Sequence, residues 1–144
     1  MSVVLRPPRS EAPGRHRVTP VQDLLKEARR LDLSSAEGRL RLGDLAEALH
    51  HELPEVVDLT DRLALDLEVD RDTITQAWFV ASAFPPATRR PGLPWAFYVI
   101  LRFHPARHEL ADRAAREGWD QARLEGELAA WFAARYDPGP DGSA

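Results

Sequence analysis

The chain contains no cysteine, which excludes a disulfide framework, a thiol nucleophile and a thiolate metal site. No stretch approaches the run of about 18 apolar residues that a membrane-spanning helix requires. The first residues also lack the continuous apolar segment of a secretory signal. Together these absences predict a cytoplasmic protein that does not associate with membranes.

Motifs of common enzyme sites are also missing. The sequence has no glycine-rich phosphate loop, no serine nucleophile elbow and no HExxH zinc motif. His104 and His108 stand four residues apart, but Pro105 between them favours a helix-capping role for His104 over a metal site. His50 and His51 are adjacent, so they point to different faces of a helix. We therefore expect no enzyme activity, no cofactor and no metal.

The charges are unevenly distributed along the 144 residues, although the net charge is only −4. Residues 1–18 carry four arginines against one acid, a balance of +3. Residues 44–72 carry ten acids against two arginines, a balance of −8, and residues 85–116 carry six arginines against two acids, a balance of +4. A polyanion is therefore expected to meet the N-terminal segment or residues 85–116 rather than the acidic middle.

Apolar residues recur at helical spacing and predict an all-α fold of about seven helices. Loops are expected at residues 32–38 and in the proline-rich stretch 85–94, and Val56 and Val57 are expected on the apolar side of the third helix. The expected helices are residues 20–31, 42–53, 54–67, 71–84, 95–103, 105–117 and 119–136.

The aromatic stretch 95–103 would also suit a strand, but nothing nearby offers a pairing strand. Its aromatic residues are expected in the core: Trp95, Phe97, Tyr98 and Phe103. We predict a flexible basic arm at 1–18, a single compact multi-helix domain at 19–136 and a tail at 137–144.

Residues 58–84 have the pattern of a helix-turn-helix, in which two helices cross at a tight turn. Ala64 is the small residue that allows the close crossing, and Val69 is the apolar residue after the turn. The turn position is usually glycine because its backbone is left-handed, and here it is Glu68, which is tolerated at a cost of about 1 kcal/mol. The buried positions of the second helix are also apolar: Ile74 and Ala77.

In a major groove, the early exposed residues of the second helix would meet the base edges. Arg71 suits guanine, Gln76 suits adenine, and Thr75 suits a phosphate or a thymine methyl group. Asp72 would repel phosphate unless it met a cytosine amino group. Asp70 as N-cap and Asp72 in the first turn also suit the positive end of the helix dipole. The alternative is that two helices simply cross in an α-domain.

Two segments carry the motifs of a resemblance, "VASAFPPATRRPGLPWAFYVI" (80–100) and "LADRAAREGWDQARL" (110–124). With the preceding helix-turn-helix, residues 42–128 resemble a group of small bacterial, phage and plasmid helix-turn-helix proteins. The resemblance implies sequence-specific or partition-type DNA binding. Glu68 and the acidic surroundings depart from the pattern of that group. The residues to which the resemblance assigns DNA contacts are Arg71, Thr75, Gln76, Arg89 and Arg90.

Further arginines are candidates for phosphate contacts. Arg89 and Arg90 follow the expected reading helix in a proline-stiffened loop, where they would clamp the backbone beside the groove or simply serve solubility. The basic arm would lie in a minor groove or remain a solvated tail. Its arginines are Arg6, Arg9, Arg15 and Arg17.

The last expected helix, residues 119–136, carries adjacent Trp131 and Phe132, which cannot both face inward fully. An exposed aromatic residue there favours a homodimer, and paired heads read paired half-sites in many DNA-binding proteins.

The sequence thus favours a helix-turn-helix protein that binds double-stranded DNA as a small transcription regulator or a nucleoid- or partition-type factor. The alternative is a non-enzymatic interaction module whose acidic face, residues 44–72, binds a basic protein or mimics DNA.

Overall fold

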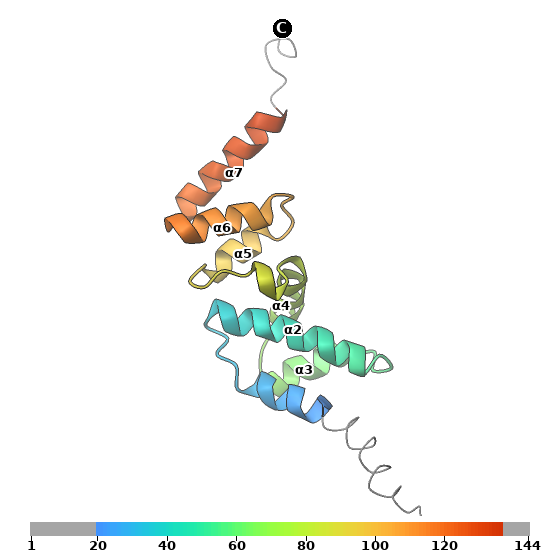
Figure 1. The fold of residues 1–144 in the computed structure, drawn as a ribbon. Helices are drawn as coiled ribbons and strands as arrows, with labels where there is room; N and C mark the ends of the chain where they lie inside the picture. Colours follow the sequence, from blue (N-terminus) through green and yellow to red (C-terminus); the bar gives the residue numbers. More distant parts are fainter. Residues whose placement is uncertain (1–19, 137–144) are drawn as a thin grey trace, which may run out of the picture. The chain divides into compact units, whose positions relative to one another are not determined.

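In the computed structural model, residues 20–136 are described, and they form seven α-helices and a short 3₁₀ turn with no strand among them. The all-α class predicted from the sequence is confirmed. The first helix covers residues 20–29. It is followed by α2 (Ala36–Glu52), α3 (Leu59–Leu67), α4 (Arg71–Ala83), the turn η1 (Pro86–Thr88), α5 (Trp95–Leu101), α6 (Arg107–Glu117) and α7 (Gln121–Tyr136), as Figure 1 shows.

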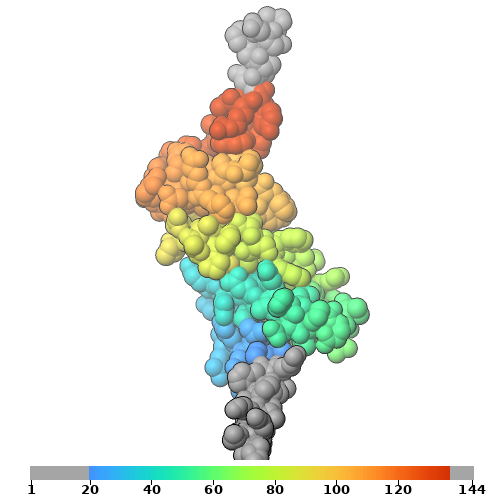
Figure 2. Space-filling model, turned by 45° about the vertical axis from the view of Figure 1, so that its right-hand side comes forward, coloured from blue at the N-terminus to red at the C-terminus, as the bar shows by residue number. Residues whose placement is uncertain are grey.

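The chain divides into two compact units between Pro85 and Pro86. The first four helices belong to the first unit, blue to green in Figure 2, and η1 to α7 belong to the second, yellow to red. The single domain predicted over residues 19–136 stays a prediction. The predicted arm (1–18) and tail (137–144) lie outside the described residues. No helix of the described part is long and apolar enough to cross a membrane.

Helices α2 and α4 cross at very short range in the first unit. A Cβ atom added to Gly43 of α2 would lie 2.1 Å from the carbonyl oxygen of Ala77 and 2.6 Å from the Cβ of Ala81, both in α4. Gly43, Ala77 and Ala81 are all buried, as are Leu42 and Leu45 beside Gly43. The small residues therefore bring the two backbones together, and the leucines fill the space around the crossing.

Helix α2 begins at Ala36, six residues before the predicted start, so the expected loop at 32–38 was wrong in its second half. Ser35 is the N-cap, and its hydroxyl accepts a 2.9 Å hydrogen bond from the amide of Gly38. A Cβ at Gly38 would lie 1.9 Å from the carbonyl oxygen of Asp32. Gly38 therefore permits a close approach of the preceding chain inside a helix and does not break the helix.

Helix α3 begins later than predicted, at Leu59, and Val57 is 97% exposed where a buried position was expected. The chain makes two turns between Leu53 and Asp58 before the helix begins. Adjacent β-branched residues lower helix propensity, which explains why Val56 and Val57 remain outside the helix.

In the second unit, α5 buries Phe97 and Tyr98 as predicted, but the helix ends at Leu101. Phe103 therefore leaves the helical face and is 76% exposed, so its predicted core position was wrong. The guanidinium of Arg102 lies over the Phe103 ring, 4.7 Å from its centroid, and covers part of this apolar surface.

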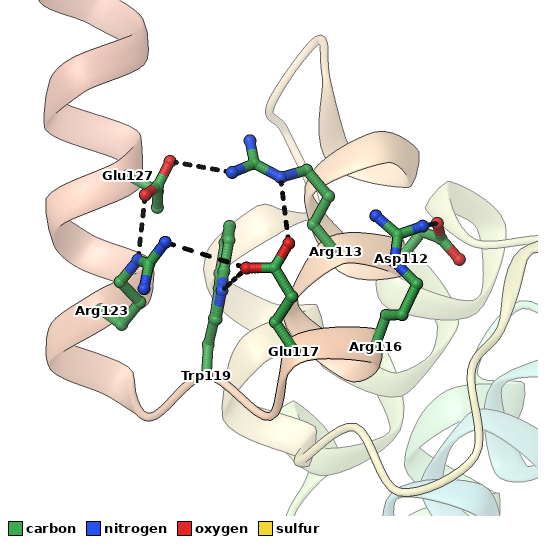
Figure 3. Close-up of polar contacts among 7 residues, drawn as sticks. All are labelled: Asp112, Arg113, Arg116, Glu117, Trp119, Arg123 and Glu127. Carbon is green, nitrogen blue, oxygen red and sulfur yellow. Dashed lines mark hydrogen bonds and ion pairs between the residues drawn. The ribbon is translucent and has the colours of Figure 1, made fainter.

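The corner between α6 and α7 is built around Trp119 (Figure 3). Gly118 ends α6 in the left-handed conformation, with φ of 64°, directly after the predicted helix end at residue 117. The buried indole then lies within about 5 Å of the Arg113 and Arg123 guanidinium groups and donates a 2.9 Å hydrogen bond to Glu117. That hydrogen bond, with the nearby arginines, holds the pKa of Glu117 below its usual range. Glu127 of α7 pairs with Arg123 and Arg113 and closes the network.

Gly43 and Gly126 provide a matched test of the α2–α4 crossing, because both stand inside helices but only Gly43 lies against another backbone. Gly43→Ala is expected to lower the free energy of unfolding by about 1–3 kcal/mol, as overpacking does. Gly126→Ala, with open space around it, is expected to raise the free energy by up to about 1 kcal/mol. Urea denaturation followed by circular dichroism measures both, and equal stabilities of the two variants would contradict the close crossing.

Candidate nucleic-acid interface

Helices α3 and α4 are joined by three residues, and the turn has the backbone conformation predicted from the sequence. Glu68 has φ of 57° and ψ of 47°, the left-handed conformation that normally selects glycine. The Val69 amide donates a 3.0 Å hydrogen bond to the Ala64 carbonyl, and the Glu68 amide donates to Leu65. These two bonds satisfy carbonyls at the end of α3 and close the helix before the chain reverses.

The residues of the two helices that the pattern assigned to the interior are buried, and Leu59, Val80 and Ala81 are buried with them. Leu63 and Ala64 of α3 are buried, and Ile74 and Ala77 of α4 are completely buried. Val69, the apolar residue after the turn, is half-buried. The opposite face of α4 is thereby directed outward.

The outward face of α4 includes the three residues predicted to contact bases. Arg71 is exposed at the start of the helix, and Thr75 and Gln76 are half-exposed one turn later. Phe79 follows on the next turn and is 58% exposed. Residues four apart share one side of a helix, so Arg71, Thr75 and Phe79 form one row, and Gln76 lies beside it.

Acidic side chains surround the start of this row. Arg71 forms an ion pair with Asp61 of α3, with Nε and Oδ1 3.3 Å apart and both side chains more than half exposed. Glu68, Asp70 and Asp72 are exposed immediately around the turn. The first turn of α4 therefore presents one arginine among several carboxylates, which repel a polyanion at long range.

Asp70 stands at the N-cap of α4 with extended backbone, as predicted, but its side chain accepts no hydrogen bond from the helix. The expected side-chain cap was therefore wrong. The helix start is instead held by a backbone bond, 3.0 Å from the Thr73 amide to the Asp70 carbonyl. The Asp70 carboxylate is exposed and is solvated by water.

Arg90, a predicted phosphate contact, holds the loop of the second unit together. Its amide donates to the Tyr98 hydroxyl at 2.9 Å, and the same hydroxyl donates to the Arg90 carbonyl at 3.0 Å. Its Nε donates to Asp112 at 2.9 Å. This bond, with the neighbouring charge of Arg116, holds the pKa of the Asp112 carboxyl below its usual value. Arg89, beside it, is half-buried.

The remaining predicted residues have different settings. The structure brings together Arg71, Thr75 and Gln76, whereas Arg89 and Arg90 belong to the second unit. The arginines of the predicted arm lie outside the described residues: Arg6, Arg9, Arg15 and Arg17. Within the described residues, no group of three or more histidine or acidic side chains is placed to hold a metal.

His104 does not have the capping role predicted from Pro105, because the N-cap of α6 is Ala106 and no side chain caps this helix. The His104 ring is buried, and Nδ1 accepts a 2.9 Å hydrogen bond from the amide of Ala106. Nδ1 is therefore unprotonated, and the neutral ring carries its proton on Nε2, which has no hydrogen-bond partner among the described residues. The ring meets Trp131 and Phe132 edge to face, at centroid distances of 4.5 and 5.5 Å.

Two features of the candidate surfaces were missed by sequence reasoning. The Asp61–Arg71 pair joins residues ten positions apart on different helices, and the only signal was the opposite charge of two residues flanking a predicted turn. The exposed Leu65, at 81%, lies in α3 with the buried Leu59 and Leu63, and the sequence does not distinguish it from them. Comparisons with family models, curated proteins and solved structures found no match to this chain.

The left-handed turn predicts how substitutions at Glu68 change stability. Glu68→Gly is expected to raise the free energy of unfolding by up to about 1 kcal/mol, because glycine adopts positive φ without a Cβ clash. Glu68→Val is expected to lower it, since a β-branched side chain is strongly disfavoured there. Thermal and urea denaturation measure both. The turn geometry would be contradicted if valine proved as stable as glycine.

The buried His104 predicts a loss of stability in mild acid. Burial, with the nearby Arg135 charge, lowers the pKa of His104 below its ordinary value of 6.5. The unfolded state therefore takes up the proton first, and the contribution of the neutral ring is complete above about pH 6.5 and is lost as pH falls through the folded pKa.

His104→Asn keeps an acceptor for the Ala106 amide but removes the titrating ring, so its free energy of unfolding is expected to fall less than that of the wild type between about pH 7 and pH 5. His108→Asn is the comparison variant: burial and the charges of Arg107 and Arg90 also lower the pKa of His108, so its removal is expected to reduce the pH dependence in the same direction. An unchanged pH dependence in His104→Asn would exclude this assignment.

Proposed function

We propose that this chain is a DNA-binding protein of helix-turn-helix type, which reads duplex DNA with α4 and acts as a small regulator or a nucleoid- or partition-type factor. The observation that carries the proposal is the pair α3 and α4. They are joined by a left-handed residue at Glu68, and α4 turns Arg71, Thr75 and Gln76 outward. This is the arrangement in which a reading helix presents its N-terminal residues to a major groove.

The side chains of the outward row suit base edges. An arginine forms two parallel hydrogen bonds with guanine, and a glutamine does the same with adenine. The exposed ion pair of Arg71 with Asp61 is worth at most about 1 kcal/mol, whereas a good bidentate base contact discriminates by about 1–3 kcal/mol. Exchange of the carboxylate for a base edge is therefore favourable.

The exposed acids around the start of α4 lower the affinity expected for the DNA backbone. Phosphate contacts normally supply most non-specific affinity, and the exposed carboxylates near the turn weaken that contribution. Sequence-specific contacts then supply a larger share of the binding free energy than they would without these carboxylates. The phosphate contacts come from residues away from the turn: Arg89, Arg90 and the arginines of residues 1–18. We accordingly propose high selectivity with modest non-specific affinity. The chain is proposed to bind DNA as a homodimer through residues 119–136.

A second candidate function is supported by the surface of α3. Leu65 is 81% exposed, and the neighbouring exposed acids are Asp58, Asp61 and Asp66. An exposed leucine among carboxylates suits a basic amphipathic segment of a protein partner. In this alternative the acidic face is the binding surface, and it does not merely face away from DNA.

Binding to duplexes selected from a random library tests the first proposal. Arg71→Ala and Gln76→Ala are each expected to weaken specific binding about 5- to 150-fold, as the loss of a base contact of about 1–3 kcal/mol does. Arg62→Ala is the matched control, because it removes the same charge from an exposed arginine of the same unit that also pairs with an aspartate. Fluorescence anisotropy at two salt concentrations measures each variant.

The proposal fails if the wild type binds no duplex at low salt, or if Arg62→Ala and Arg71→Ala weaken binding equally. Asp61→Asn separates the two candidate functions. Loss of this carboxylate is expected to strengthen DNA binding, since it removes a negative charge and releases Arg71. In the alternative function the same substitution weakens binding of a basic partner and leaves DNA binding absent.

A further inference from the structure

Helix α7 buries very little of its own surface. Of its 16 residues, only Leu124 is fully buried. Trp131 and Leu128 are half-buried, while Phe132 and Tyr136 are exposed, Phe132 at 44%. Figure 1 shows α7 diverging from α6. A helix normally gains its stability in water from packing an apolar face, so the apolar residues that α7 leaves exposed need a partner.

The exposed stripe of α7 has the spacing of a helix-pairing seam. Its members alternate in steps of four and three residues, which keeps a seam on one side of a helix. From the N-terminal end they are Gln121, Glu125, Leu128, Phe132 and Arg135. The stripe is therefore apolar at its centre, acidic on the N-terminal side and basic on the C-terminal side.

The two charged members of the stripe are available for a partner. Glu125 accepts a 3.1 Å hydrogen bond from Gln121 and forms no ion pair with a described residue. Arg135 lies 4.1 Å over the ring of Trp131 and likewise forms no ion pair within residues 20–136. By contrast, Glu127 is already held by Arg113 and Arg123, so it belongs to the fold of the unit.

The arrangement of the stripe is self-complementary about Ala130. Glu125 and Arg135 stand at the same distance on either side of Ala130, and about 15 Å separates the two along the helix axis. Leu128 and Phe132 lie between them, again at the same distance on either side of Ala130. A second α7 in antiparallel orientation places Glu125 against the partner's Arg135 and Leu128 against the partner's Phe132, each twice. In a parallel pair, Glu125 would meet the partner's Glu125, and the arginines would also repel each other.

We propose that α7 is the self-association surface of this chain. Two copies pair antiparallel about a two-fold axis that crosses the seam at the height of Ala130, whose own side chain lies on the side away from the stripe. Glu125–Arg135 ion pairs form at both ends of a Leu128–Phe132 contact. Such an interface is isologous, since each copy contributes the same patch. One helix pair buries an area at the low end for specific complexes, so the dimer dissociates in the micromolar range or above. This inference gives residues and a register to the homodimer in the proposed function, and it stands without DNA binding.

Charge reversal tests the register in the absence of DNA. Sedimentation equilibrium of the full chain, at total concentrations from about 1 to 500 µM, gives the dissociation constant of each variant. Glu125→Arg and Arg135→Glu are each expected to raise the dissociation constant at least tenfold, because each places like charges together at both ends of the seam. The double variant, which restores opposite charges, is expected to return to within about threefold of the wild type.

Ala130→Glu is the matched control, because it adds a charge to an exposed position of α7 on the side away from the stripe, and its dissociation constant is expected to change less than twofold. Circular dichroism establishes that each variant retains its helices. A wild type that stays monomeric over the whole range overturns the proposal, and so does a double variant that remains as weak as the single ones. DNA binding by a monomer would overturn the pairing and leave the reading function intact.

Discussion

The first unit depends on the contact between Gly43 and Ala77, where two helical backbones meet without side chains between them. This contact fixes the rotation of α4 about its own axis, because the row of small residues Ala77 and Ala81 faces Gly43 and most other residues of α4 would place a larger side chain there. Because of this rotation, Ile74 and Ala77 are buried. The opposite side of the helix, with Arg71, Thr75 and Gln76, is directed outward. The composition of the candidate interface is thus a consequence of packing on the opposite side of the same helix.

The sequence was sufficient for the parts of the fold that local rules determine. The left-handed residue at Glu68, the buried Ile74 and the glycine end of α6 all follow from spacing and turn chemistry within a few residues. The errors have two causes: a close contact overrode a local rule, or a helix began or ended at a different residue from the one the pattern indicated. Gly38 permits a close approach of Asp32 where glycine usually indicates a break, and Phe103 leaves the core because α5 ends two residues earlier.

The candidate site shows the same division. The residues on one helix face were predictable because helical periodicity orders them, and the structure brings Arg71, Thr75 and Gln76 together. The partners of the arginines were not predictable, since Arg90 and Asp112 are 22 residues apart and meet only through the path of the loop. Charge balance along the sequence likewise located the acidic region but not the ion pair of Asp61 with Arg71. Pairwise contacts of exposed charges require coordinates.

The loop around Arg90 has a consequence for the energetics of recognition. Its backbone is fixed at both ends of one residue by the Tyr98 hydroxyl, and its side chain is fixed by Asp112. Folding has therefore already restricted the conformational freedom that a flexible loop would lose when it met a ligand. A contact made by Arg89 or by the neighbouring backbone carries a smaller entropic penalty than the same contact from an unrestrained segment. A rigid support therefore lowers the entropic cost of any contact that this segment makes, without adding charge.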